Sequence, residues 1–189
     1  KDSKKDAAAT QGDKIDKAKR DALDKAQASF KKKPGDANVC RDLAMRYIAV
    51  ASPESPDNPK EAPKLPKDRD KNLKGAVVTL ESCTKIDSKD RDIKQMLSST
   101  YMATGKFDKA SALLEDLAKT AKGADRANAY YAWGLAASNA TQYTDAISAW
   151  TTFSTLAPAK DPRVKQIKQS ITALKAAAKA PKAPAATTT

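Results

Sequence analysis

Two cysteines, Cys40 and Cys83, are the most reactive side chains in this chain of 189 residues. A thiol can act as a nucleophile, bind a metal or form a disulfide. The chain has no histidine, so the commonest activator of a catalytic thiol and the commonest metal ligand are both missing. The cysteines therefore indicate either a disulfide or two free thiols, and neither has the surroundings of a nucleophile.

The carboxylates give no better sign of catalysis. Glutamate occurs only at Glu54, Glu61, Glu81 and Glu115, and adjacent acids on a helix diverge rather than face one substrate. The sequence lacks the phosphate-binding G-x-x-x-x-G-K-S/T loop, the dinucleotide G-x-G-x-x-G loop and the metalloprotease H-E-x-x-H motif. We therefore predict a protein that is not an enzyme, with no cofactor, no metal site and no small-molecule substrate.

The net charge of +12 and the pI of about 9.6 would attract nucleic acid, anionic lipid or acidic polymers. The basic residues are mostly lysines mixed with aspartates, however, and the sequence has no cluster of arginines and aromatics that could stack bases. This pattern disfavours nucleic-acid binding and favours a solvated surface. Binding of anionic polymers remains an alternative function.

The spacing of apolar residues predicts helices. Aromatics make up 5% of the chain and glycines number six, which is not typical of a β-sandwich or barrel. Apolar positions three and four residues apart predict helices over 14–33, 36–51, 72–86, 91–104, 106–121, 124–139, 143–156 and 161–178. Most breaks between them are short, which predicts antiparallel neighbours.

The remaining segments set the expected domain limits. Residues 1–13 are charged and small, and we expect a disordered start. Residues 179–189, KAPKAPAATTT, are expected to form a flexible tail. Residues 52–71 form a proline-rich insertion with the period of polyproline II, predicted to be an exposed loop, with a Pro-x-x-P ligand as the alternative. The helical domain is predicted over 14–178.

Residues 104–110, TGKFDKA, and residues 140–146, ATQYTDA, repeat the same pattern. Anchor alanines at Ala22, Ala76, Ala110 and Ala146 are separated by 54, 34 and 36 residues, that is 34 plus the insertion of 20, then 34, then 34 plus two. Small residues let antiparallel helices approach, and large residues around them fill the layer. Because one hairpin cannot bury both of its faces, such hairpins are expected to stack.

This spacing resembles the tetratricopeptide repeat (TPR) family, whose unit is a helix–turn–helix of 34 residues. The matching and packing positions are Ala22, Ala76, Phe107, Ala110, Trp133, Gly134, Tyr143, Ala146, Trp150 and Pro158. They define three units, 37–88, 91–123 and 127–160, with a half unit before them and a solvating helix after them. The resemblance implies an all-α fold, a right-handed superhelical α-solenoid of antiparallel helix hairpins.

In this repeat arrangement Cys40 and Cys83 lie on the two helices of the first unit. Each lies about eleven residues from the loop end of its helix, so both are at a similar height. A disulfide is then compatible with the geometry and would tie together a hairpin that the insertion loosens. Two buried free thiols are the alternative. A disulfide would imply an oxidising compartment.

The resemblance implies that the first helices line a concave groove that binds a peptide or a partner's helix. The candidate groove residues are Arg41, Met45, Ile48, Gln95, Met96, Ser99, Met102, Tyr131, Leu135, Ser138 and Asn139. The lysine and asparagine set by which some members hold a terminal carboxylate is missing. The methionines suit varied apolar partners.

These features predict a non-enzymatic protein–protein interaction scaffold that binds a protein partner or a second copy. A structural subunit of a cell-envelope assembly or filament is the alternative. The candidate disulfide, the missing initial Met and the lysine- and proline-rich ends favour an exported or membrane-anchored bacterial protein, periplasmic or on the outer face. It could be tethered to the membrane through an upstream segment, and a cytoplasmic location is the alternative.

Overall fold

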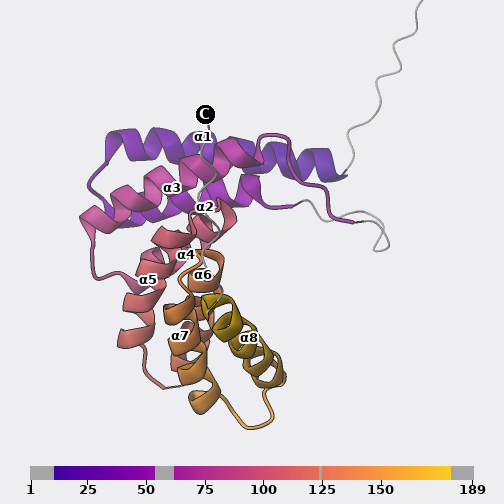
Figure 1. The fold of residues 1–189 in the computed structure, drawn as a ribbon. Helices are drawn as coiled ribbons and strands as arrows, with labels where there is room; N and C mark the ends of the chain where they lie inside the picture. Colours follow the sequence, from indigo (N-terminus) through magenta and orange to yellow (C-terminus); the bar gives the residue numbers. More distant parts are fainter. Residues whose placement is uncertain (1–10, 54–61, 124, 180–189) are drawn as a thin grey trace, which may run out of the picture. The chain divides into compact units, whose positions relative to one another are not determined.

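The computed structural model describes residues 11–53, 62–123 and 125–179. The regular elements of these residues are eight α-helices, which confirms the predicted all-α class (Figure 1). The chain divides into two compact units, unit 1 ending at Thr104 and unit 2 beginning at Gly105. None of the described helices combines the length and the hydropathy that crossing a bilayer requires.

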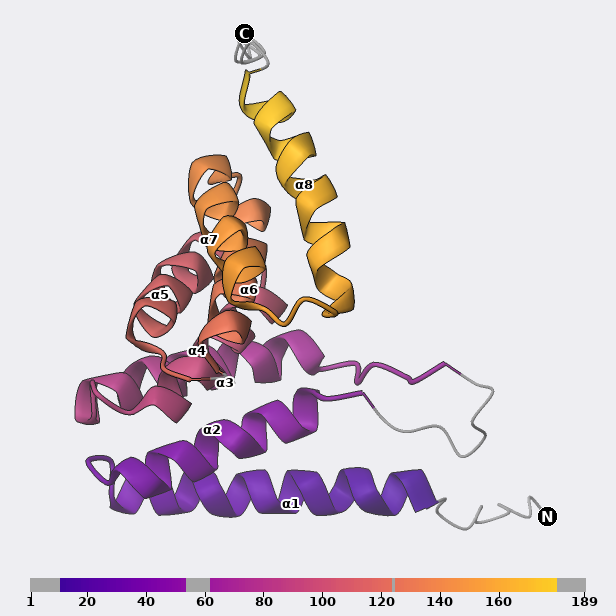
Figure 2. The same ribbon diagram turned by 90° about the horizontal axis from the view of Figure 1, so that it is seen from below.

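Unit 1 contains α1 (Gln11–Lys32), α2 (Ala37–Ala51), α3 (Arg69–Ile86) and α4 (Arg91–Ala103). Each helix packs against the next one in the chain (Figure 2). The most extensive contact is that between α2 and α3. The side chain of Asp36 begins α2 by accepting hydrogen bonds from two backbone N–H groups. The predicted hairpin of residues 37–88 therefore corresponds to α2 and α3.

Unit 2 contains α5 (Phe107–Thr120), α6 (Asp125–Asn139), α7 (Tyr143–Leu156) and α8 (Pro162–Lys179). Here too each helix packs on its neighbour in sequence. The predicted hairpin of residues 127–160 corresponds to α6 and α7. The predicted unit of residues 91–123 is divided, because α4 belongs to unit 1 and α5 to unit 2.

Two helices begin earlier than the sequence pattern predicts. α1 starts at Gln11, within the segment predicted to be disordered, and α3 starts at Arg69, within the predicted insertion. The added residues, 11–13 of α1 and 69–71 of α3, include no large apolar side chain, so the spacing of apolar residues cannot predict them. The rest of the predicted N-terminal segment, residues 54–61 of the insertion and the tail beyond Lys179 lie outside the described residues.

Three of the four anchor alanines, Ala76, Ala110 and Ala146, are fully buried. Ala22 is only half-buried, and the buried positions of α1 are Leu23 and Ala26 instead. Among the described helices of unit 1, α1 packs mainly against α2. The side of α1 that faces α2 therefore carries Leu23 and Ala26, and it is rotated round the helix from the side, marked by Ala22, that the repeat predicts.

Glycines inside two helices make room for aromatic rings. A Cβ atom added at Gly134 in α6 would overlap the indole ring of Trp150 in α7. The Trp150 Nε1–H donates a hydrogen bond to the Tyr131 carbonyl oxygen at 3.2 Å. A Cβ atom at Gly75 in α3 would lie 2.6 Å from Cε1 of Tyr47 in α2. These close approaches let α2 and α3, and α6 and α7, pack as tight pairs.

The two echoing heptapeptides form equivalent turns. Gly105 precedes α5 with a φ of 70°, and Thr141 precedes α7 with a φ of 59°, both in the left-handed region. In each case an aromatic residue, Phe107 or Tyr143, is the first residue of the following helix. The echo in the sequence is therefore one backbone corner used twice.

Candidate interaction surfaces

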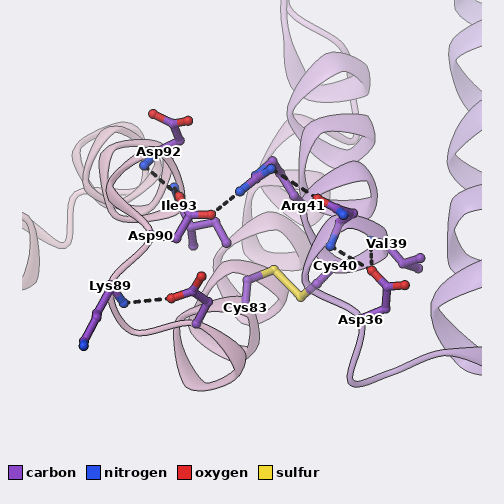
Figure 3. Close-up of polar contacts among 11 residues, drawn as sticks. Asp36, Val39, Cys40, Arg41, Cys83, Lys89, Asp90, Asp92 and Ile93 are labelled. Carbon is purple, nitrogen blue, oxygen red and sulfur yellow. Dashed lines mark hydrogen bonds and ion pairs between the residues drawn. A yellow bond between two sulfur atoms is a disulfide. The ribbon is translucent and has the colours of Figure 1, made fainter.

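A disulfide between Cys40 and Cys83 joins α2 to α3 (Figure 3). Their Cα atoms are 5.6 Å apart, and both residues are fully buried. Cys40 is near the start of α2 and Cys83 near the end of α3, so the bond holds the end of the hairpin opposite to the proline-rich connection. It spans 43 residues and fixes one end of the tightest helix pair in unit 1.

Asp90 fixes the start of α4 against α2. Its carboxylate accepts hydrogen bonds from the backbone N–H groups of Asp92 at 2.9 Å and Ile93 at 3.1 Å, and it pairs with the guanidinium of Arg41 (Figure 3). Burial opposes the charge, but the bonds from Ile93 and Arg41 outweigh it and hold the pKa of Asp90 below its ordinary value. Arg41, predicted as a groove residue, is thus engaged inside unit 1.

A third contact ties the beginning of α3 to α1. Arg20 Nη1 donates to Asp68 Oδ2 at 2.6 Å, and its Nη2 donates to Oδ1 at 3.2 Å. This bidentate bond lowers the pKa of Asp68 to about 2. Asp68 directly precedes α3, so the pair anchors the chain where it returns from the proline-rich connection.

An apolar groove of about 270 Å³ opens in unit 1 and is called here the α2–α4 groove. Its lining residues are Ile48, Leu73, Gln95, Met96, Ser99, Thr100 and Ala103. Leu73 is only 6% exposed, whereas Gln95 and Ser99 are exposed and supply polar groups. The volume lies below the ~300–1,000 Å³ of typical small-molecule pockets. The groove therefore suits an apolar side chain of a partner better than a whole small molecule.

Four predicted groove residues, Ile48, Gln95, Met96 and Ser99, meet in the α2–α4 groove. The prediction missed three others. Thr100 and Ala103 lie four residues after Met96 and Ser99, so helical spacing along α4 could have found them. Leu73 belongs to α3, and the prediction considered only the first helix of each repeat.

Met45 and Met102 do not line the α2–α4 groove. Met45 is 52% exposed on α2, and Met102 is half-buried near the end of α4. Met45 and Met102 lie on faces of α2 and α4 next to the groove. The groove is therefore narrower than the surface that the repeat pattern predicts.

In unit 2 the predicted groove residue Tyr131 is half-buried and packs against Arg163 of α8. The guanidinium carbon of Arg163 lies 4.9 Å from the centroid of the Tyr131 ring and 5.1 Å from that of Phe153. Arg163 also pairs with Asp161 at 2.7 Å and donates to Asn128 Oδ1 at 3.0 Å. These contacts give Tyr131 a packing role within unit 2.

The other predicted residues of unit 2 share one side of α6. Leu135 is 41% exposed, Ser138 is half-buried, and Asn139 Nδ2 donates to the Leu135 carbonyl oxygen at 2.8 Å. They form a small mixed surface on α6.

The described residues offer little for chemistry. No group of three or more Cys, Asp or Glu side chains among them could hold a metal ion. The most perturbed phenol is Tyr101, which donates a hydrogen bond to Glu81 at 2.6 Å. Burial and Glu81 raise the pKa of Tyr101 above its ordinary value, so it stays protonated and acts as a structural donor between α4 and α3.

Comparisons with known proteins agree with the geometry. The tetratricopeptide repeat family model matches residues 69–133. The crystal structure of MamA superposes with a TM-score of 0.59 at 16% identity, covering 91% of this chain and 86% of MamA. A thermophilic TPR protein of Thermus thermophilus, TTC0263, gives 0.51 at 14% identity, covering 85% of this chain and 74% of that protein. No curated protein sequence matches the chain. The predicted resemblance to TPR proteins is confirmed.

Proposed function

We propose that this tetratricopeptide-repeat-like protein is a non-enzymatic interaction scaffold that holds an apolar segment of a partner protein in the α2–α4 groove. The observation that carries the proposal is the groove itself, an apolar hollow with Gln95 and Ser99 exposed in its lining. Apolar anchors with a few polar groups around them are the usual arrangement at peptide-binding surfaces.

The groove walls are held in place before any partner arrives. The Cys40–Cys83 disulfide fixes α2 to α3, and the Arg41–Asp90 pair fixes α2 to α4. A preorganised site loses less entropy on binding. Met96 supplies a flexible thioether within these fixed walls, so one groove can accept apolar side chains of different shape.

The first experiment places a photoreactive amino acid at Ser99, inside the groove, or at Met45, outside it. We expect a crosslink from position 99 to one defined protein and little or no crosslink from position 45. A crosslink to a second copy of the chain would favour the structural-subunit alternative, which sedimentation of the purified chain then tests. Equal crosslinking from both positions would contradict the groove.

The second experiment measures affinity for the crosslinked partner. Met96→Glu puts a charge into the apolar groove and Ser99→Arg blocks its polar edge, so each should weaken binding more than tenfold. Met45→Glu is the matched control and should bind like the wild type. Circular dichroism must show that all three variants keep their helices. Unchanged affinity in both groove variants would contradict the proposal.

We also propose that the protein works outside the cytoplasm, either exported or tethered to a membrane. The support is the buried disulfide, because such bonds persist mainly in oxidising compartments. Rapid denaturation of source cells in a thiol-alkylating reagent, followed by mass measurement without reduction, tests the location, because the buried cysteines become accessible only in the unfolded chain. We expect both cysteines to remain unmodified. Alkylation of both cysteines would contradict the proposal and indicate a cytoplasmic location.

A further inference from the structure

The positive charge of this chain is concentrated at one end of the sequence. Residues 162–189 contain no acidic residue and six basic ones, Arg163, Lys165, Lys168, Lys175, Lys179 and Lys182. This segment therefore supplies half of the net charge of +12. Elsewhere the lysines alternate with aspartates, so the imbalance is local and belongs to α8 and the C-terminal residues after it.

Three of these lysines form a stripe along α8. At about 100° per residue, Lys165, Lys168 and Lys175 fall within about 80° of one another round the helix, with Thr172 between them. All four residues are exposed. The stripe is about 15 Å long, from a rise of about 1.5 Å per residue. We call Lys165, Lys168 and Lys175 the α8 lysine stripe.

The stripe is not neutralised by the part of the chain that the structure describes. No hydrogen bond, ion pair or ring contact of the three ammonium groups occurs among the described residues. By contrast, Arg163 pairs with Asp161, and Lys119 pairs with Glu115 at 2.6 Å. The three ammonium groups of the stripe thus have no counter-charge among the described residues, and α8 itself contains no Asp or Glu.

The helix presents this stripe from a fixed position. α8 packs against α7, and Ile167, only 4% exposed, anchors its apolar side together with the half-buried Val164, Ile171 and Leu174. The lysines lie about 100° round the helix from that side. Because the apolar residues are used for packing inside unit 2, α8 can bind an external surface by charge and not by insertion.

We propose that the α8 lysine stripe docks the protein onto an anionic lipid surface. Lysine is a hydrated point charge without the fork by which arginine grips individual carboxylates or phosphates, so it suits a diffuse charged plane. α8 has no aromatic side chain, which disfavours base stacking on single-stranded nucleic acid. The stripe shares no residue with the α2–α4 groove, so each proposal can fail without the other.

The experiment is co-sedimentation of the full chain with vesicles of phosphatidylcholine alone or mixed with phosphatidylglycerol. We expect binding to the anionic vesicles only. Raising salt from about 0.1 to about 1 M shortens the screening length from about 10 to about 3 Å and should release the protein. Lys165→Gln, Lys168→Gln and Lys175→Gln together should lower the partition coefficient about a hundredfold, at about fivefold per lysine.

A matched control removes the same charge elsewhere, with Lys17→Gln, Lys25→Gln and Lys31→Gln on the exposed side of α1. The control triple variant should lose much less binding than the α8 triple variant. Equal losses would show that net charge alone is responsible, and absence of binding to anionic vesicles would overturn the proposal outright. Displacement from vesicles by soluble polyglutamate at equal charge concentration would also overturn it, in favour of an acidic protein partner.

Discussion

At the scale of single residues, Thr141 has a backbone conformation that its side chain disfavours. Its φ of 59° lies in the left-handed region, where a β-branched residue is rare. The Gln142 N–H donates to the Ala137 carbonyl oxygen at 2.9 Å and closes the end of α6. This hydrogen bond requires Thr141, the residue before Gln142, to adopt a positive φ. The equivalent position of the preceding repeat has Gly105.

We therefore expect Thr141→Gly to stabilise the protein. The left-handed conformation costs a residue with a Cβ atom about 1–2 kcal/mol, and the greater freedom of glycine in the unfolded chain offsets part of that gain. The net increase in the free energy of unfolding should be about 0.5–1 kcal/mol, measured by urea denaturation. The opposite change, Gly105→Thr, should destabilise the protein. A lower midpoint for Thr141→Gly would show that the Thr141 side chain compensates for its conformation.

At the scale of elements, a surface ion pair holds the start of α3. The carboxylate of Asp68 pairs with Arg20 of α1, and the pKa of Asp68 falls from 3.8 to about 2. Because the folded-state pKa lies below the unfolded value, the pair stabilises the fold fully only above the unfolded pKa of 3.8. That contribution is lost as the pH falls towards about 2.

We expect Asp68→Asn to lower the free energy of unfolding by no more than about 1 kcal/mol at about pH 7. The bound is small because Arg20 and Asp68 side chains are 44% and 33% exposed. The difference from the wild type should shrink as the pH approaches about 2, measured by urea unfolding at several pH values. Asp70→Asn is the matched control, since that side chain is 90% exposed. A difference that stays constant with pH would contradict the ion-pair explanation.

The repeat pattern succeeds for helices and fails for some helix starts. It predicts the end of α2 at Ala51 and both ends of α7, because apolar spacing and turn residues mark them. It misses the starts of α1 and α3 because polar residues can extend a helix without leaving a periodic signal. The bond between Arg20 and Asp68, 48 residues apart, is invisible to local spacing.

At the scale of the whole molecule, the disulfide belongs to only one of the two compact units. Cys40 and Cys83 both lie in unit 1. A cross-link over 43 residues reduces the entropy of the unfolded chain and is worth about 4 kcal/mol in the chain-entropy model. The two units should therefore respond differently to its loss.

We expect the double variant Cys40→Ala, Cys83→Ala to be less stable by about 2–4 kcal/mol, with the loss confined to unit 1. Hydrogen exchange should accelerate in α1 to α4 and remain unchanged in α5 to α8. When hydrogen exchange is measured under reducing, mildly denaturing conditions, the wild type should exchange at the same rates as the variant. Adding reductant should not change the exchange rates of the variant, because it has no disulfide. Equal acceleration in both units would show that they unfold together.

The candidate groove shows the same division between local and distant information. The repeat pattern brought together Ile48, Gln95, Met96 and Ser99, because residues on the first helices of stacked hairpins keep a common phase. It also selected Arg41 and Tyr131, which internal partners occupy: Asp90 in the first case and Arg163 in the second. Which neighbour a side chain contacts depends on residues of other helices, so the position of a residue round its own helix cannot predict that contact.

The sequence by itself determined where most helices lie and that α2 pairs with α3 and α6 with α7, because these follow from short-range spacing: apolar positions within a helix, small residues at contacts, and turns between helices. It also brought Cys40 and Cys83 to the same height of one hairpin. Only the tertiary structure decided how wide the groove is, which candidate residues line it, and which lysines are left without a counter-charge. Those properties depend on distances between side chains far apart in the chain, which packing sets and composition does not record.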